Sequence, residues 1–217
     1  MSEDAIYRRR FDEQDRRLRM ELWAVICSYL QRYVPPSSAL LEIGCGDGEF
    51  IRNMPARERW AADLREIPDD LPEAIRYVQA DGLKLRESVP EGHYDRIFMS
   101  NYLEHLLSPD DVIEQLRVVH DLLAPGGQVI ILQPDIALIG GAYWDFIDHR
   151  VPITRQSLTE ALELAGMRPV EVIPRFLPYT TKGRLPTSAR LAELYLRLRP
   201  AWWLLGKQML VVAEPWR

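Results

Sequence analysis

Short apolar runs and helical patterns alternate along most of the chain. The apolar runs are of strand length and are rich in aliphatic and aromatic side chains. They occupy residues 39–43, 59–62, 75–79, 96–100, 128–132, 168–173 and 208–213. Because parallel neighbours need a long connection, usually a helix, this alternation predicts an α/β fold with a doubly wound, mostly parallel, seven-stranded sheet.

The helical patterns begin and end at recognisable signals. Residues 11–33 place apolar side chains three and four positions apart and stop before a Pro-Pro pair. Residues 110–123 open on a Ser-Pro pair and close on a Pro-Gly-Gly turn, and residues 157–165 end at a glycine. We expect an N-terminal helix that caps the domain and crossover helices that cover the sheet, whereas residues 134–151 show no clear periodicity.

The length of 217 residues fits a single decorated domain. We expect an N-terminal helical cap at 1–36, a ligand-binding core at 37–133, and a segment at 134–217 that contacts a second ligand. An insertion before the last strand, residues 174–207, contains a basic amphipathic stretch and an apolar one. Such stretches are typical of an element that packs on the domain or forms a homodimer. Contact with a membrane surface is the alternative, and it would suit a lipid-linked ligand.

Composition narrows the class of protein. Hydrophobic residues make up 47% and charged residues 27%, as in soluble globular domains, and the net charge of -5 argues against nucleic acid as a partner. The N-terminus lacks the apolar core of a secretory signal, and the most apolar stretch, residues 128–147, is broken by a proline and two aspartates. We therefore expect a cytoplasmic protein whose two cysteines, Cys27 and Cys45, are reduced thiols.

A glycine-rich turn follows the first expected strand. Gly44, Gly46 and Gly48 alternate there, after Glu42 and around Cys45. Such a turn offers bare backbone and the N-terminus of the following helix to a ligand. A dinucleotide fingerprint would read G-x-G-x-x-G, whereas this turn reads G-x-G-x-G, which favours a cofactor without a pyrophosphate.

Carboxylates end the next two expected strands. Asp63, followed by Leu64, ends the second strand, where a doubly wound sheet places an acid that accepts hydrogen bonds from ribose hydroxyls. Asp81 and Gly82 follow the third strand, where a carboxylate and backbone amides can receive an adenine. We therefore expect three strand ends to bind one nucleoside-sized ligand.

These signatures, in this order, resemble the class I S-adenosylmethionine-dependent methyltransferases, in particular the subgroup called type 11. The resemblance covers roughly residues 40–132 and includes the fourth-strand segment 95–105 and the helix-end turn 123–127. It implies S-adenosylmethionine as cofactor, S-adenosylhomocysteine as product, and an antiparallel final strand. The cofactor-binding residues that it implies are Glu42, Gly44, Cys45, Gly46, Gly48, Asp63, Leu64, Asp81, Gly82, Ser100 and Asn101.

A second, looser resemblance concerns the acceptor. Residues 144–154 and 175–182 are similar to segments of bacterial methyltransferases of surface-polysaccharide and glycolipid synthesis, which implies a sugar or glycolipid precursor. A sugar hydroxyl is a poor nucleophile, so we expect a base within hydrogen-bond reach of it. His105 and His149 are the candidates, because each follows a strand at the carboxyl end of the sheet.

Other roles for these side chains stay open at the level of sequence. Each histidine could instead cap a helix or bond a backbone carbonyl. Glu104, His105 and His149 could bind a divalent cation, although Asn101 stands where a further carboxylate would help. An amine acceptor would need little beyond positioning, because the sulfonium methyl is already activated.

Two further functions are compatible with the sequence. An aromatic or polyketide acceptor would predict an apolar pocket, and the side chains that would form it are Tyr143, Trp144, Phe146 and Phe176. A scaffold or regulator could bind the cofactor without turnover, since fold and cofactor loop do not guarantee chemistry. Residues 7–11 are expected to form a solvated arm, with a lid over the cofactor as the alternative.

Overall fold

A computed structural model describes residues 13–179 and 188–216. In this part of the chain a seven-stranded sheet has the strand order β3-β2-β1-β4-β5-β7-β6. The strands are β1 (Ala39–Ile43), β2 (Glu58–Asp63), β3 (Ile75–Gln79), β4 (Tyr94–Ser100), β5 (Leu123–Pro134), β6 (Met167–Leu177) and β7 (Gln208–Pro215). β1 to β5 pair in parallel, whereas β7 is antiparallel to both of its neighbours, β5 and β6. The expected fold class and the antiparallel final strand are confirmed.

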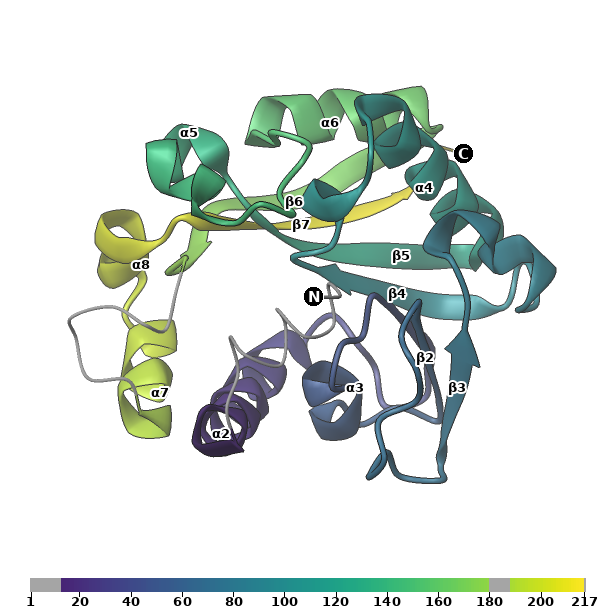
Figure 1. The fold of residues 1–217 in the computed structure, drawn as a ribbon, viewed down its shortest axis with the longest axis horizontal. Coiled ribbons are helices and arrows are strands. Elements are labelled where there is room, and N and C mark those ends of the chain that lie inside the picture. Colours follow the sequence, from purple (N-terminus) through teal and green to yellow (C-terminus); the bar gives the residue numbers. More distant parts are fainter. Residues whose placement is uncertain (1–12, 180–187, 217) are drawn as a thin grey trace.

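Helices cover both faces of this sheet (Figure 1). The α-helices are α2 (Glu13–Leu30), α3 (Glu49–Asn53), α4 (Pro109–Leu122), α5 (Ile136–Ile139), α6 (Arg155–Leu164), α7 (Ala189–Arg197) and α8 (Arg199–Leu205). The 3-10 helices are η1 (Gly82–Glu87), η2 (Leu103–His105) and η3 (Gly140–Asp145). Figure 1 shows α2, α3 and α7 on one side of the sheet and α4 and α6 on the other. This is the layered arrangement that a parallel sheet needs to bury both of its faces.

Alternate strand residues supply two separate cores. In β4, Ile97 and Met99 pack under α4 and α6, whereas Phe98 packs on the opposite face. Phe98 stacks on Phe50 of α3 with ring centroids 3.7 Å apart, and Trp23 of α2 meets both rings edge-on. The N-terminal helix thus rests directly over the helix that follows the glycine turn, which fixes the position of that turn.

The bounds of two strands, β5 and β6, differ from the sequence-based expectation. The expected start of the insertion at residue 174 is wrong, because β6 continues to Leu177, which pairs with Gln208 after a register shift. A strand tolerates proline at such an irregularity, and Pro174 lies within it. The Pro-Gly-Gly turn after α4 lies inside β5 instead of before it, since Leu123 already pairs with Tyr94.

The segment without periodicity, residues 134–151, contains two short helices. α5 begins after Asp135, whose side chain accepts a hydrogen bond from the amide of Ala137 at 3.0 Å. η3 follows at once and ends at Asp145. These helices are too short to show a period of 3.6 residues, so the pattern of apolar side chains could not reveal them.

The remaining sequence-based expectations are placed as follows. Cys27 and Cys45 are free and buried. Residues 7–11 and 180–182 lie outside the described part of the chain. None of the helices in residues 13–179 and 188–216 combines the length and apolar character that a membrane crossing requires.

The connection between β6 and β7 carries exposed Leu194, Trp203 and Leu204, and its expected role as a packing or homodimer element stays a prediction.

The start of α4 makes a prediction about stability. Ser108 precedes the helix, and its hydroxyl accepts a hydrogen bond from the amide of Asp111 at 3.1 Å. We expect Ser108→Ala to lower the free energy of unfolding by about 1 kcal/mol, because one amide of the first turn loses its partner. Chemical denaturation measures this change. Thr159→Ala, which removes a hydroxyl from within α6, serves as the control, and an equal loss in that variant would contradict the capping role.

Candidate active site

The glycine turn joins β1 to α3 at the carboxyl end of the sheet. Gly44, Gly46 and Gly48 have φ values of 71°, 58° and 77°, in the left-handed region that side chains with a Cβ rarely adopt. Glu42, at the end of β1, is buried, and its Oε2 accepts a hydrogen bond from the amide of Ile51 at 3.0 Å. The sequence therefore folds into an open backbone loop whose two ends are tied together by a buried carboxylate.

Asp63 holds this loop against the end of β2. Its Oδ2 accepts a hydrogen bond from the amide of Gly46 at 2.8 Å, and its Oδ1 accepts from the amide of Arg65 at 3.0 Å. The guanidinium of Arg65 also lies 3.3 Å from Oδ1. Leu64, next to it, is 69% exposed. A carboxylate has about four acceptor positions, so Asp63 can still accept a hydrogen bond from a ligand.

Asp81 and Gly82 begin the turn after β3. The Asp81 side chain accepts a hydrogen bond from the amide of Leu83 at 3.0 Å and so begins η1. A Cβ on Gly82 would stand 2.0 Å from the Tyr102 hydroxyl, and a Cβ on Gly44 would stand 2.4 Å from the Tyr102 ring. These two glycines therefore make room for Tyr102, whose hydroxyl donates to Oε1 of the buried Gln115 at 2.8 Å.

Tyr102 is a residue that the sequence interpretation did not identify. Its ring lies between the turn after β1 and the turn after β3, so it forms a wall between the expected methionine and adenine positions. Its place in the chain, directly after Ser100 and Asn101, was the available signal. Burial raises the pKa of its hydroxyl, which therefore stays protonated and acts as a hydrogen-bond donor.

Carboxylates surround the glycine turn. Burial, and then the charge of Glu49, raise the pKa of Glu42 well above its ordinary value. Arg19 of α2 lies 2.9 Å from Asp47 and 2.8 Å from Glu49 and offsets part of this charge. Burial likewise raises the pKa of the Cys45 thiol, so this cysteine is a packing residue and not a nucleophile. An open backbone loop among acids fits a cationic sulfonium such as S-adenosylmethionine.

Ser100 and Asn101 end β4 beside this turn. Asn101 has a φ of 47°, and its amide donates to the carbonyl of Leu132 at 3.0 Å. Its side-chain Nδ2 donates to the Ser100 hydroxyl oxygen at 3.1 Å. A left-handed residue other than glycine is uncommon, and such residues gather at binding sites. Both side chains lie at the strand end where the resemblance expects them, next to Tyr102.

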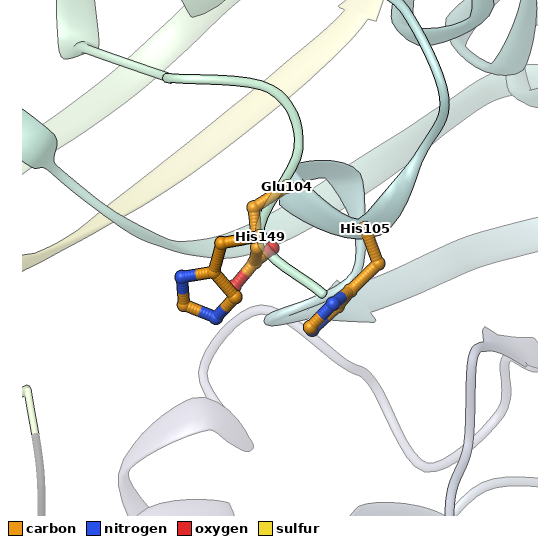
Figure 2. Close-up of side chains that lie close together, drawn as sticks. All are labelled: Glu104, His105 and His149. Atoms are coloured by element: carbon orange, nitrogen blue, oxygen red, sulfur yellow. The ribbon is translucent and has the colours of Figure 1, made fainter. Parts of the chain in front are cut away.

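Glu104, His105 and His149 come together immediately beyond this strand end (Figure 2). One nitrogen or carboxylate oxygen of each residue lies within 4.8 Å of those of the other two, and the two imidazole centroids are 5.0 Å apart. Glu104 and His105 belong to η2, whereas His149 comes from the segment after η3. The carbonyl of Glu104 accepts hydrogen bonds from the amides of Arg150 and Val151, at 2.8 and 3.1 Å, and so joins the two segments.

Polar and aromatic side chains surround the trio of Glu104, His105 and His149. Glu104 is fully buried; its Oε2 accepts from Gln133 Nε2 at 3.1 Å, and burial raises the pKa of its carboxyl while His105 opposes the shift. His105 Nδ1 lies 3.0 Å from the carbonyl oxygen of Asp148. The rings of Tyr143 and Phe146 lie 4.7 and 5.1 Å from that of His149.

The aromatic pocket considered from the sequence does not form as a unit. Tyr143 and Phe146 lie beside His149, and Trp144 is 51% exposed. Phe176 is fully buried in the other core, where it packs on Tyr29 and Trp202. Phe176 therefore cannot line a common pocket with the three residues of η3 and the segment after it.

Comparisons with known proteins agree with this geometry. A family model described as a methyltransferase domain matches residues 13–172. No functionally curated protein matches the sequence significantly. A methyltransferase of Haloferax volcanii, solved in complex with a methyltransferase activator, is similar with a TM-score of 0.67 and 14% identity, over 95% of each chain.

Two further solved structures share the fold. An S-adenosylmethionine-dependent methyltransferase of Mesorhizobium loti has a TM-score of 0.62 and 21% identity, over 86% of this chain and 95% of that one. The 1,6-didemethyltoxoflavin-N1-methyltransferase of Burkholderia thailandensis, solved with its acceptor and S-adenosylhomocysteine, has a TM-score of 0.57 and 18% identity, over 88% and 76%. The match of the family model to most of the chain shows that the protein belongs to the methyltransferase domain family and is an S-adenosylmethionine-dependent methyltransferase.

Proposed function

We propose that this methyltransferase acts on a hydroxyl oxygen of a small acceptor, a sugar or glycolipid precursor. The observation that carries the proposal is the meeting of His105 and His149 beside the end of β4. Two separate segments bring imidazoles to within 5.0 Å of each other at the edge of the sheet where ligands bind in such folds. Only an acceptor that must lose a proton needs such groups.

The surroundings of the two histidines favour a polar acceptor. Glu104 and Asp148 provide oxygen acceptors within the same cluster, and Phe146 provides an aromatic face. Hydrogen-bonding groups beside a ring suit a sugar, which has hydroxyls on its edges and an apolar face. An aromatic metabolite is less favoured as acceptor, because Phe176 is buried in the core under α2 and does not join Tyr143 and Phe146 beside His149.

Within this proposal the cofactor occupies the strand ends described above. Glu42 and the backbone of the glycine turn hold the methionine portion, Asp63 accepts hydrogen bonds from the ribose hydroxyls, and Asp81 with Gly82 receives the adenine. The remaining residues of the proposed cofactor site are Cys45, Leu64, Ser100 and Asn101. The sulfonium then faces the end of β4, so that its methyl group lies toward the histidines.

The chemistry needs positioning first and proton removal second. An oxygen lone pair of the acceptor forms a bond to the methyl carbon while the bond from that carbon to sulfur breaks, and its electron pair stays on the now neutral sulfur. The hydroxyl proton has to leave as well. An imidazole meets this need either by accepting the proton through its own lone pair or by using that lone pair to bind a cation that acidifies the hydroxyl.

Calorimetric titration with S-adenosylhomocysteine, with NAD as the control, tests the cofactor part of the proposal. We expect micromolar binding of S-adenosylhomocysteine alone, because the turn offers bare backbone and no pyrophosphate site. Methyl transfer to a panel of nucleotide sugars, glycolipids and aromatic phenols then tests the acceptor class. Methyl transfer to phenols alone would show that the acceptor is aromatic and that the proposed sugar acceptor is wrong. Cofactor binding without methyl transfer to any acceptor would favour a scaffold.

A further inference from the structure

We propose that Glu104, His105 and His149 bind a divalent transition-metal ion, which holds the acceptor hydroxyl beside the methyl group. The binding itself stands on the geometry of the three side chains (Figure 2), whereas the role of the ion in methyl transfer rests on the proposed function. The three side chains offer two imidazole nitrogens and a carboxylate oxygen, the donor set of many catalytic zinc and iron sites.

The carboxylate of Glu104 has a polar atom that the protein leaves unsatisfied. Glu104 is fully buried, and only its Oε2 has a partner, Gln133. Oε1 is buried and has no hydrogen-bond partner among the described residues. A buried carboxylate oxygen without a partner is unfavourable, so the group either takes up a proton or pairs with a cation. A bound metal ion would supply the missing positive charge at this oxygen.

The hydrogen bond of His105 fixes which of its nitrogens can bind a cation. Its Nδ1 lies 3.0 Å from the carbonyl oxygen of Asp148, and a carbonyl can only accept. Nδ1 therefore carries the proton, and the lone pair of the neutral ring is on Nε2. Metal-binding histidines nearly always make such a bond from the other ring nitrogen, because it fixes the tautomer and the ring orientation.

His149 is held in place by its neighbours on the chain and by aromatic rings. The amides of Arg150 and Val151 bond the Glu104 carbonyl, and the rings of Tyr143 and Phe146 pack against the imidazole. The donor atoms lie within 4.8 Å of one another. Tetrahedral ligands at about 2.1 Å from an ion lie about 3.4 Å apart. Binding therefore requires donor atoms that are up to 4.8 Å apart to approach one another by as much as about 1.4 Å. The side chain of His105 is 36% exposed, so it has room for such a movement.

The donor set also indicates the kind of ion. Two imidazoles and one carboxylate favour Zn²⁺, Fe²⁺, Co²⁺ or Mn²⁺ over Mg²⁺ and Ca²⁺, which prefer oxygen ligands. Three protein ligands leave coordination positions open, as in catalytic sites. An acceptor hydroxyl bound there would lose its proton to water more readily, because the cation lowers its pKa. The acceptor oxygen would then form its bond to the methyl carbon as the carbon–sulfur bond breaks.

The acids near the glycine turn do not form a competing metal site. Asp47 and Glu49 are paired with Arg19, and Asp63 bonds Gly46 and Arg65. Each of these three carboxylates therefore already has a guanidinium beside it. Glu104 differs from them because its unsatisfied oxygen lies next to two imidazoles instead of a guanidinium.

Cobalt binding to the full-length protein tests this site directly. The purified chain is treated with a chelator, desalted and titrated with Co²⁺, while the visible absorption band of protein-bound cobalt and the metal content after a second desalting are measured. We expect close to one tightly bound Co²⁺ per chain, displaced by Zn²⁺ and not by Mg²⁺. Absence of bound cobalt in the wild-type chain would overturn the proposal, whatever the variants do.

Two variants assign the ion to the trio. Glu104→Gln keeps the size of the side chain but removes its charge. We expect cobalt binding to weaken by at least about 10-fold, because loss of a ligand costs no less than loss of a residue that only orients one. His120→Asn on α4, which changes a histidine paired with Asp121 outside the cluster, should leave the cobalt titration unchanged. Circular dichroism and S-adenosylhomocysteine binding test whether each variant is folded. If Glu104→Gln does not fold, His105→Asn takes its place in the cobalt titration. Equal cobalt affinity in wild type and the folded cluster variant would place the ion elsewhere.

The metal site and the proposed function fail in distinguishable ways. If cobalt does not bind but cluster variants lose methyl transfer, the histidines act as bases and only the metal inference falls. If cobalt binds at the trio but no hydroxyl acceptor is methylated, the site stands and the proposed acceptor class is wrong. Activity of the chelated enzyme, compared with that of the Zn²⁺-loaded enzyme, separates a catalytic ion from one that only satisfies the charge of Glu104.

Discussion

His149→Asn is expected to lower the rate of methyl transfer by about 100-fold or more. Asparagine is polar and fits the space, but it can neither accept a proton at neutral pH nor replace an imidazole as a strong metal ligand. His149 contacts Tyr143 and Phe146 and is not among the residues proposed to hold the cofactor. The affinity for S-adenosylhomocysteine should therefore be unchanged.

Single-turnover kinetics with saturating cofactor measure this rate, and calorimetry measures the cofactor affinity. His120→Asn is the matched control, since it removes an imidazole from the surface of α4 without touching the site. Full activity in the His149 variant would show that the imidazole does not contact the acceptor. A parallel loss of cofactor affinity would instead indicate that the variant disturbs the end of β4.

The strands could be predicted because both faces of the sheet are buried. β1 and residues 129–132 of β5 are buried, mainly apolar runs, so their positions show in the sequence without knowledge of their neighbours. Ala39–Ile43 and Ile75–Gln79 end where the sequence places them. The end of β6 could not be predicted, because the residues beyond the register shift are recognised as strand only through the pairing of Leu177 with Gln208.

The positions of the proposed cofactor residues on the sheet could be predicted for a local reason, whereas the meeting of Glu104, His105 and His149 could not. The glycine turn, Asp63 and Asp81 each directly follow a strand, so their position on the sheet follows from the strand order. The contact of Glu104 with His149 depends on hydrogen bonds between the turn after β4 and the segment after η3. No periodicity in residues 134–151 indicates that fold-back, and the sequence could offer the trio only as one alternative among several.

The position of Tyr102 shows a further limit. Gly44 and Gly82 suggest close approach of a ligand, and the structure shows that a side chain of the protein takes part of that space. A glycine motif says that a Cβ is not tolerated but does not say what approaches it. The division of the chain into a cap at 1–36, a core at 37–133 and an acceptor-side segment at 134–217 also stays a prediction.

Asp63→Ala is expected to weaken the binding of S-adenosylhomocysteine by about 10- to 100-fold, the range expected when a hydrogen bond to a charged acceptor is lost. The carboxylate is the proposed acceptor for the ribose hydroxyls. The Asp63 carboxylate also accepts a hydrogen bond from the amide of Gly46 at 2.8 Å. Its loss therefore removes a contact that joins the glycine turn to β2. Both effects act on the cofactor and neither acts on the histidines.

Calorimetric titration of Asp63→Ala measures the change, and two variants separate its causes. Asp63→Asn keeps one oxygen for the Gly46 amide but loses the charge, so it should bind the cofactor with intermediate affinity. Asp69→Ala removes an exposed acid from the same β2–β3 connection and should leave the affinity unchanged, which excludes a general effect of net charge. Wild-type affinity in Asp63→Ala would mean that the nucleoside does not lie at the end of β2. Because Asp63 ends β2 and His149 lies in the segment after η3, loss of binding in one variant and loss of turnover in the other would assign the cofactor and the acceptor to separate parts of the site.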